Sequence, residues 1–245
     1  MIKSFRTAAL LGTSIGFGAL SVLAHAAADN CRAASSERVP TIVELYTSEG
    51  CSSCPPADKW LSSLKGRSDV LPLAFHVDYW DRLGWVDRFA TPAASARQYE
   101  LAHRSGSNSV YTPQVRVNGR DWTQWPRLPK AEMQSAIHAS LARDGQTVTL
   151  QVAASASGPA RLDGYWAVLE DDHQSKVRAG ENAGATLKHD GVVRLYQPVA
   201  AWSATAGNTA TLTVGHGVPQ NPRRVVFVVT DATTHQPLQA VSLAC

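Results

Sequence analysis

Two cysteines separated by two residues, Cys51 and Cys54, are the part of this 245-residue sequence best suited to chemistry. Thiols at this spacing can close into a disulfide, reopen by thiol–disulfide exchange, or bind a soft metal. An apolar, β-rich run precedes them at 41–47, and residues 55–64 begin with two prolines and then place apolar side chains at helical spacing. Because proline is tolerated in the first turn of a helix, we expect a strand, the cysteine pair and then a helix.

This placement predicts a division of labour between the two thiols. A helix N-terminus favours a nearby anion, so we expect Cys51 to be the attacking thiolate. Cys54, one turn further into the helix, would then resolve the mixed disulfide by attacking Cys51. Two other interpretations of the pair stay open, a permanent local disulfide and two buried thiols.

A proline stands directly before an alternating run, residues 114–118, that ends in an Asn-Gly turn. Together with the strand and the cysteine pair, Thr112-Pro113 resembles the thioredoxin fold, in which a cis-proline packs beside the redox pair and presents backbone to a substrate. The resemblance implies a catalytic role for Pro113 and a substrate-binding role for Thr112. It also implies that Glu44 relays a proton to Cys54, and the alternative is an outward-facing carboxylate on the strand.

Four longer segments stand out, at 47–58, 76–85, 110–114 and 180–184. Together they resemble one family of exported bacterial thioredoxin-like proteins, DUF1223. The family name implies a fold and a redox motif but no known substrate. The role of the last segment is unassigned.

The hydrophobic pattern divides the chain into two parts. Residues 38–145 alternate strands with helices, so the fold class that we expect is an α/β thioredoxin-like domain followed by an all-β sandwich-like domain over 146–245. The first domain carries an insertion near 79–107. Its expected strands are 41–47, 70–77 and 114–118, and its expected helices are near 55–65, near 92–104 and 130–143. The strands expected later are 147–153, 162–170, 192–199, 209–214, 225–230 and 238–243.

The first residues have the pattern of an export signal. Lys3 and Arg6 precede an apolar run, and small residues at positions 24 and 26 predict cleavage after Ala26. We therefore expect a signal peptide over 1–26, an N-terminal arm over 27–37, and a periplasmic or secreted protein. No later segment is long and apolar enough for membrane insertion. Removing the signal lowers the formal charge of +3 by two, and the absence of a basic stripe argues against nucleic acid as a partner.

The remaining cysteines, Cys31 and Cys245, lie at opposite ends of the mature chain. In an oxidising compartment two such thiols favour a structural disulfide that ties the N-terminal arm to the last strand. The alternative is a second redox pair that passes electrons to the first.

Acidic and aromatic residues gather at the end of the second expected strand, 70–77, and just after it. A metal site would need converging ligands, and His76, Asp78 and Asp81 do not have a metal-binding spacing, so we expect neither a metal nor a cofactor. Trp80 and Trp85 are expected to line a substrate groove beside the thiols or to fill a local core.

These features predict a thiol–disulfide oxidoreductase that acts on exported proteins with thiols or disulfides. One alternative is a redox-inert module that binds an exported partner while Cys51 and Cys54 stay locked together. Another is a Cu(I)-handling protein, which the presence of only Met1 and Met133 does not favour. Residue types do not fix whether the pair oxidises, reduces or isomerises its partner.

Overall fold

A computed structural model describes residues 1–2, 31–129, 133–215 and 217–245. The predicted signal peptide, apart from its first two residues, and the beginning of the predicted N-terminal arm lie outside this part of the chain. Within the described residues, no helix has the length and apolar character needed to cross a membrane.

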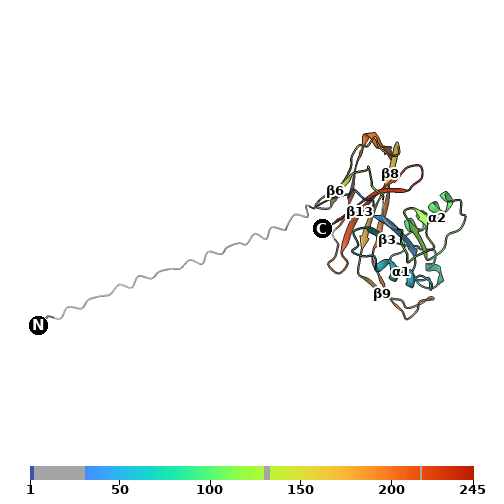
Figure 1. The fold of residues 1–245 in the computed structure, drawn as a ribbon. Coiled ribbons are helices and arrows are strands. Elements are labelled where there is room, and N and C mark those ends of the chain that lie inside the picture. Colours follow the sequence, from blue (N-terminus) through green and yellow to red (C-terminus); the bar gives the residue numbers. More distant parts are fainter. Residues whose placement is uncertain (3–30, 130–132, 216) are drawn as a thin grey trace.

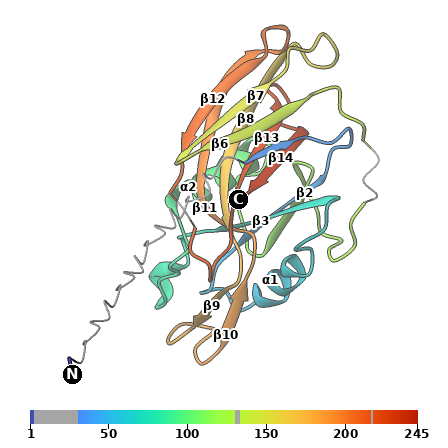
Figure 2. The ribbon, with the colours of Figure 1, turned by 90° about the vertical axis from the view of Figure 1, so that its left-hand side faces the viewer.

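The fold is built on one eight-stranded sheet, with the strand order β14-β13-β8-β11-β3-β2-β4-β5 (Figures 1 and 2). In chain order these strands are β2 (Thr41–Thr47), β3 (Val70–His76), β4 (Gln114–Val117), β5 (Arg120–Asp121), β8 (Arg161–Glu170), β11 (Val192–Ser203), β13 (Arg223–Asp231) and β14 (Pro237–Ala244). β2 and β3 are parallel, and β3 meets β11 in parallel through one pair, Ala74 with Val192. The other neighbours are antiparallel. The sheet therefore runs without interruption from the first half of the chain into the second.

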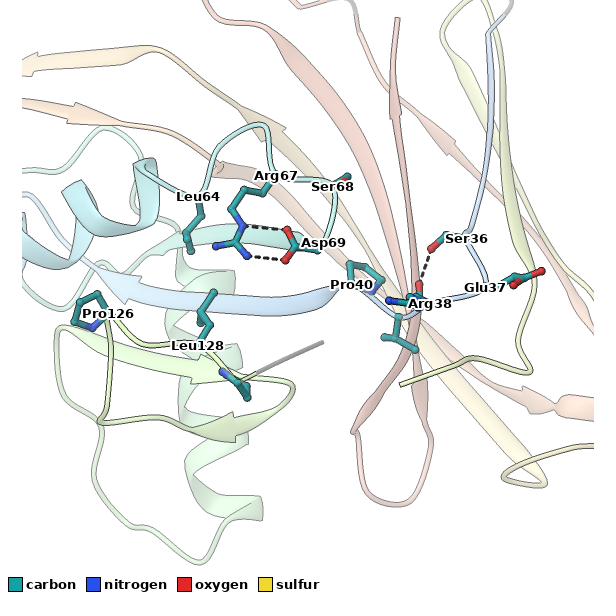
Figure 3. Close-up of a pocket in the computed structure, with 12 residues that line it drawn as sticks. Ser36, Glu37, Arg38, Pro40, Leu64, Arg67, Ser68, Asp69, Pro126 and Leu128 are labelled. Atoms are coloured by element: carbon teal, nitrogen blue, oxygen red, sulfur yellow. Dashed lines mark hydrogen bonds and ion pairs between the residues drawn. The ribbon is translucent and has the colours of Figure 1, made fainter. Parts of the chain in front are cut away.

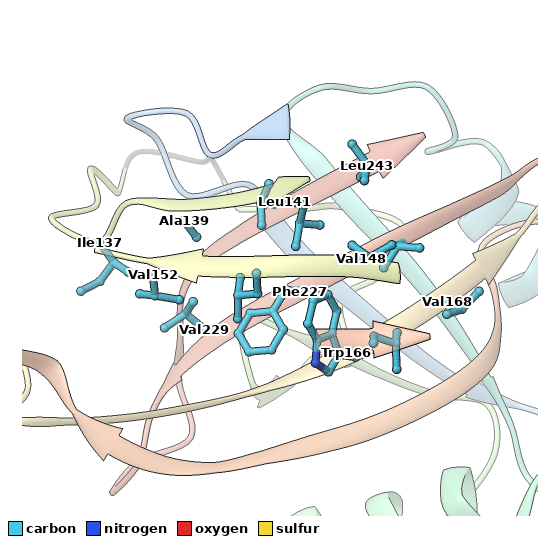
Figure 4. Packing of buried hydrophobic residues seen from close by; sticks show 14 of the residues in the cluster. Ile137, Ala139, Leu141, Val148, Val152, Trp166, Val168, Phe227, Val229 and Leu243 are labelled. Carbon is cyan, nitrogen blue, oxygen red and sulfur yellow. The ribbon is translucent and has the colours of Figure 1, made fainter. Parts of the chain in front are cut away.

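A second, four-stranded antiparallel sheet has the order β1-β6-β7-β12. Its strands are β1 (Arg32–Ala34), β6 (Ala139–Asp144), β7 (Thr147–Val152) and β12 (Asn208–Thr213). Apolar side chains of this sheet pack against β8, β13 and β14 in a shared core (Figure 4). At its centre the rings of Trp166 and Phe227 meet edge to face, with their centroids 4.9 Å apart. Burying these large side chains holds the two sheets together.

Two α-helices, α1 (Pro55–Ser62) and α2 (Pro92–Arg104), are present in the described part of the chain, with short 3-10 turns η1 (Asp81–Leu83) and η2 (Ala204–Ala206). The start of α2 follows from its sequence, because the Thr91 hydroxyl accepts the N–H of Ala94 and a proline occupies the next position. Side chains of β2 alternate between faces, so α1 packs with Leu45 on one face and α2 lies with Tyr46 on the other.

The expected fold class, an α/β thioredoxin-like domain followed by a separate all-β sandwich-like domain, is wrong. The protein is mostly β, and strands of both halves belong to the same large sheet. One buried core also joins the halves, since Phe75 of β3 lies in the same apolar cluster as Leu169 of β8 and Val226 of β13. Neither half could keep this surface buried alone.

The helix expected over 130–143 is also wrong for 133–143, and residues 130–132 lie outside the described part of the chain. Residues 139–144 form β6, which pairs with β7 and β1. Ile137, Ala139 and Leu141 alternate with more exposed residues and point into the core between the sheets. This two-residue period, supported by tertiary pairing, outweighs the helix propensity of the segment. A hairpin that the pattern did not predict consists of β9 (His173–Lys176) and β10 (Thr186–His189).

A buried ion pair ties α2 to the large sheet. The Glu44 carboxylate accepts hydrogen bonds from Arg97 of α2 at 2.6 Å and from the Tyr165 hydroxyl of β8 at 2.8 Å. The Arg97 guanidinium also lies over the Tyr165 ring, 4.3 Å from its centroid. Burial raises the pKa of Glu44, but the charge and hydrogen bond of Arg97 and the hydrogen bond of Tyr165 together outweigh burial, and the pKa is lowered. Glu44 thus stays ionised and holds three elements together.

We predict that Glu44→Gln lowers the free energy of unfolding at neutral pH by about 3 kcal/mol, because it leaves Arg97 buried without its counterion. Since the folded-state pKa of Glu44 lies below its ordinary value, its contribution is complete above about pH 4.5 and is lost as the pH falls through the folded-state pKa. The difference between wild type and Glu44→Gln in urea unfolding should therefore shrink at acid pH.

Glu100→Gln is the matched control. Glu100 pairs with Arg104 on the same helix, but its side chain is 53% exposed. Exposed pairs contribute little, so this variant should unfold within about 0.5 kcal/mol of wild type at every pH. Equal losses in the two variants would contradict a special role for the buried pair.

The structure joins Cys31 and Cys245 by a disulfide, with their Cα atoms 6.1 Å apart. Cys31 precedes β1 at the edge of the small sheet, and Cys245 follows β14 at the edge of the large sheet. The bond therefore connects the two sheets across a sequence separation of 214 residues.

We predict that Cys245→Ser lowers the free energy of unfolding by about 2–5 kcal/mol, since the unfolded chain is no longer closed into a long loop. Thiol–disulfide exchange at Cys51 and Cys54 should be unchanged in the protein that remains folded. Urea unfolding of the oxidised proteins, followed by thiol titration, tests both statements. A variant with the wild-type free energy of unfolding would show that this disulfide does not stabilise the fold.

Candidate functional site

Cys51 and Cys54 form a disulfide where β2 gives way to α1, with their Cα atoms 5.4 Å apart. Cys54 is the N-cap residue of α1, and its N–H donates to the carbonyl of Cys51. Pro55 and Pro56 open the helix, as the sequence suggested, but they have no N–H to donate. The Ser53 hydroxyl lies 3.4 Å from the Cys51 sulfur and is a polar group in direct contact with it.

Both cysteines are fully buried, whereas Ser52 and Ser53 between them are exposed. A turn far along the chain, residues 180–182, is hydrogen-bonded to the cysteine loop. The Asn182 amide donates to the carbonyls of Glu49 and Cys51, at 2.9 Å each, and the N–H of Ser52 donates to the Glu181 carboxylate at 3.0 Å. The turn, whose role the sequence left unassigned, thus closes the disulfide from the solvent side.

Gly180 allows this turn to lie close to the body of the protein. Its φ is +75°, and a Cβ added there would lie 3.2 Å from the Cβ of Trp85. Both the backbone conformation and the space favour glycine. Trp85, in turn, donates from its indole N–H to the Glu49 carboxylate at 2.7 Å. Trp85 therefore packs between the turn at 180–182 and Glu49 rather than lining an open groove.

Trp80 connects the cysteine loop to the segment before β4. It packs against Gly50, and its indole N–H donates to the Thr112 hydroxyl at 2.8 Å. The Thr112–Pro113 bond is cis, as the sequence analysis expected. Because Gln114 pairs with Tyr46 near the end of β2, Pro113 lies at the same end of the sheet as the cysteines. A second cis bond, Trp125–Pro126, was not expected.

Glu44 is placed differently from the predicted proton relay. Its carboxylate is held by Arg97, Tyr165 and Tyr46 on the α2 face of the sheet. Helix α1, which begins at Cys54, packs on the opposite face with Leu45. The geometry therefore gives Glu44 a part in the ion pair described above and not a path to Cys54.

Beneath the cysteine loop lies a group of buried ionisable residues that the sequence analysis did not bring together. Asp87 Oδ2 lies 2.6 Å from Nδ1 of His76. Carboxylate oxygens lie near both ring nitrogens of His189, Glu49 Oε1 at 3.3 Å from Nε2 and Asp58 Oδ1 at 3.7 Å from Nδ1. The exposed fraction of every member is 6% or less. We call these five residues the buried polar cluster.

The pKa values of residues in this cluster depend on the charges of their neighbours. Burial lowers the pKa of His189, but the Asp58 and Glu49 carboxylates outweigh it and raise the pKa to about 9. Burial raises the pKa of Asp87, but the charge of His76 and its hydrogen bond outweigh it and lower the pKa to about 2. The pKa of Glu49 is lowered as well, since its bond with His189 opposes the effect of burial. Glu49 and Asp87 are therefore ionised at neutral pH.

Of this cluster, the sequence analysis singled out only His76. The acidic residues that it grouped with His76 have other partners: Asp78 binds the Ser95 hydroxyl, and Asp81 accepts the N–H of Asp87. The five members come from five separate parts of the chain: the cysteine loop, α1, β3, the loop before α2, and β10. Glu49, Asp58 and His76 fall inside the segments that carried the family resemblance, but no local spacing indicates that they meet.

A cavity of about 910 Å³ lies elsewhere (Figure 3). It is bordered by the segment before β2, by the turn between α1 and β3, and by residues 126–129. Arg67 and Asp69 form an ion pair at its wall. None of the four cysteines lines it.

Comparisons with known proteins agree with this arrangement of the chain. A family model described as "Protein of unknown function (DUF1223)" matches residues 42–230. A crystal structure of a protein from Agrobacterium tumefaciens is similar, with 26% identity, a TM-score of 0.63, and coverage of 86% of this chain and 96% of that chain. HBP35 of Porphyromonas gingivalis shares the fold at 13% identity and a TM-score of 0.58, over 86% of this chain and 76% of that chain. A search of curated proteins finds no match.

We predict that Asn182→Ala accelerates reduction of the Cys51–Cys54 disulfide by dithiothreitol roughly tenfold. The substitution removes the two hydrogen bonds that hold the turn over the disulfide, each contributing about 1 kcal/mol. Peptide mapping of alkylated thiols over time separates this reduction from that of the Cys31–Cys245 bond.

Asn221→Ala is the control, because the Asn221 amide also donates to a backbone carbonyl, but to that of Asp171 and not to one in the cysteine loop. It should leave the reduction rate of Cys51–Cys54 unchanged. If Asn182→Ala also reduces at the wild-type rate, the turn does not limit access to the sulfurs.

Proposed function

The chain belongs to the DUF1223 family, whose description assigns no activity, and we propose that it carries out thiol–disulfide exchange with an exported protein through Cys51 and Cys54. The observation that supports this most directly is the disulfide itself. It joins two cysteines only three positions apart, at the N-terminus of a helix, a place that favours a transient thiolate. A bond across so short a loop contributes less to stability than one across a long loop.

The exchange conserves atoms and electrons in two steps. A partner thiolate attacks the Cys51 sulfur, the bond to Cys54 breaks, and Cys54 leaves as a thiolate that takes up a proton. A second partner thiol, after losing its proton, then attacks the partner's sulfur in the mixed disulfide, and Cys51 leaves as a thiolate that takes up a proton. The partner gains a disulfide, and its two electrons remain on the reduced cysteines. The reverse sequence reduces a partner disulfide.

Access is the condition for this chemistry. Since both sulfurs are buried, the turn at 180–182 has to move before a protein thiol can reach Cys51. The exposed backbone of Ser52, which donates to the exposed Glu181, marks the side from which a partner would approach. Weak, solvent-exposed contacts such as this one break most easily.

The same burial favours a second candidate function, a binding module in which the disulfide never opens. In that case the exposed surface around Ser52 and the turn would contact an exported partner without any exchange. The two functions differ in whether Cys51→Ser abolishes activity toward the partner.

We predict that the Cys51–Cys54 bond equilibrates with glutathione and that Cys54→Ser, which cannot resolve, accumulates a mixed disulfide at Cys51. Mass spectrometry of acid-quenched, alkylated protein measures both. Cys51→Ser should form no such adduct at Cys54, and Cys245→Ser should equilibrate like wild type.

A Cys51–Cys54 bond that stays oxidised in reduced glutathione buffers, also in Asn182→Ala, would exclude exchange and leave the binding module. An adduct on Cys54 in place of Cys51 would reverse the two roles while keeping the chemistry.

A further inference from the structure

We propose that Asp58, His76 and His189 form a binding site for a divalent transition metal ion, with Zn²⁺ as the ion to test. One ligand atom from each of the three lies within 4.8 Å of the other two, and all three residues are buried. Two imidazoles and one carboxylate are a common ligand set for Zn²⁺ and for Fe²⁺. No metal was expected from the spacing of His76, Asp78 and Asp81, whereas the three ligands proposed here come from α1, β3 and β10.

The unpartnered nitrogens of the two histidines are the first argument. His76 Nε2 and His189 Nδ1 are buried and have no hydrogen-bond partner. A buried polar atom without a partner costs about 1–3 kcal/mol, so such atoms are uncommon. Here two of them lie together with a carboxylate oxygen, Asp58 Oδ1, at 3.7 Å from His189 Nδ1. Ligands of a tetrahedral zinc ion at about 2.1 Å are themselves about 3.4 Å apart, so the three ligand atoms, which lie within 4.8 Å of one another, have to move together to bind the ion.

The outer contacts of each ligand are the second argument. Asp87 holds His76 through the other ring nitrogen, Nδ1, at 2.6 Å. Thr47 donates from its hydroxyl to Oδ2 of Asp58 at 2.8 Å. Glu49 lies 3.3 Å from the other nitrogen of His189, Nε2. In metal sites a carboxylate or similar group commonly fixes the far side of each ligand, so that the near side faces the ion.

Charge is the third argument. Glu49, Asp58 and Asp87 are three buried carboxylates, and their partners among the described residues are imidazoles, a hydroxyl, an indole and backbone N–H groups, with no Lys or Arg side chain. Burying several carboxylates together is unfavourable unless cations compensate them. Without a metal, protonated His189 supplies one positive charge to these three carboxylates, whereas a divalent ion bound by neutral imidazoles supplies two. The mixed nitrogen and oxygen ligands do not suit Cu(I), which prefers sulfur.

The experiment uses the whole oxidised protein, so that its four cysteines, paired in disulfides, cannot bind zinc as thiolates. After EDTA treatment and buffer exchange, Zn²⁺ is titrated in by calorimetry, and the bound metal is counted by mass spectrometry of the elements. We expect one Zn²⁺ per chain and a melting temperature that rises with free Zn²⁺. X-ray absorption of the zinc-loaded protein should show nitrogen and oxygen ligands with imidazole signatures and no sulfur at about 2.3 Å.

His76→Gln, His189→Gln and Asp58→Asn should each weaken Zn²⁺ binding at least about 100-fold. His173→Gln is the matched control, since His173 lies opposite His189 in the β9–β10 register but is bound by Glu170. It should bind zinc like wild type. Circular dichroism of the metal-free variants checks that each is folded.

Absence of stoichiometric zinc in the folded wild type would overturn the proposal and leave a network of hydrogen bonds and ion pairs between the carboxylates and the histidines. Zinc bound equally well by His189→Gln, or a sulfur ligand in the absorption spectrum, would also overturn it. The absorption result needs no variant, so a variant that fails to fold leaves the test intact. None of these outcomes depends on thiol exchange.

Discussion

Burial of β2 and β3 on both faces of the large sheet is the constraint on which the rest of the structure depends. Polar side chains at such positions have no access to water and need partners from elsewhere in the chain. Glu44 finds Arg97, Thr47 finds Asp58, and His76 finds Asp87. Each of these bonds fixes a segment against the sheet: α2, α1 and the loop before α2. The polar residues of two buried strands therefore determine where the surrounding elements lie.

The β9–β10 hairpin joins the two features that could carry function. Its connection, residues 177–185, covers the disulfide through Glu181 and Asn182, and its last residue, His189, lies in the buried polar cluster. Figure 2 shows the hairpin beside α1, the helix that begins at Cys54. Any movement that uncovers the cysteines thus begins in the segment that also positions His189, so access to the sulfurs and the arrangement of the cluster share one structural element.

Sequence reasoning succeeded where the signal is local. It located β2, the cysteine pair and the start of α2, because alternation, spacing and capping are read within a few residues. It was wrong about the division of the fold, since periodicity does not say which strands pair, and the single parallel contact of Ala74 with Val192 is a long-range fact. It missed β9 and β10 because they are short and polar. It missed the cluster for a related reason, as His189 meets Asp58 only through the folded hairpin.

The charges beneath the cysteines would also limit the proposed redox chemistry in a way that the helix position alone does not suggest. Glu49 stands two residues before Cys51, and the N–H of Asp58 donates to the carbonyl of Cys54, so two carboxylates flank the pair. Buried negative charge disfavours a further anion nearby, whereas the helix N-terminus favours it by at most about 2 kcal/mol. A cation among these carboxylates, whether protonated His189 or a metal ion, offsets that repulsion. The stability of the reduced pair then depends on what the cluster holds, since thiolate stabilisation sets the potential of a dithiol.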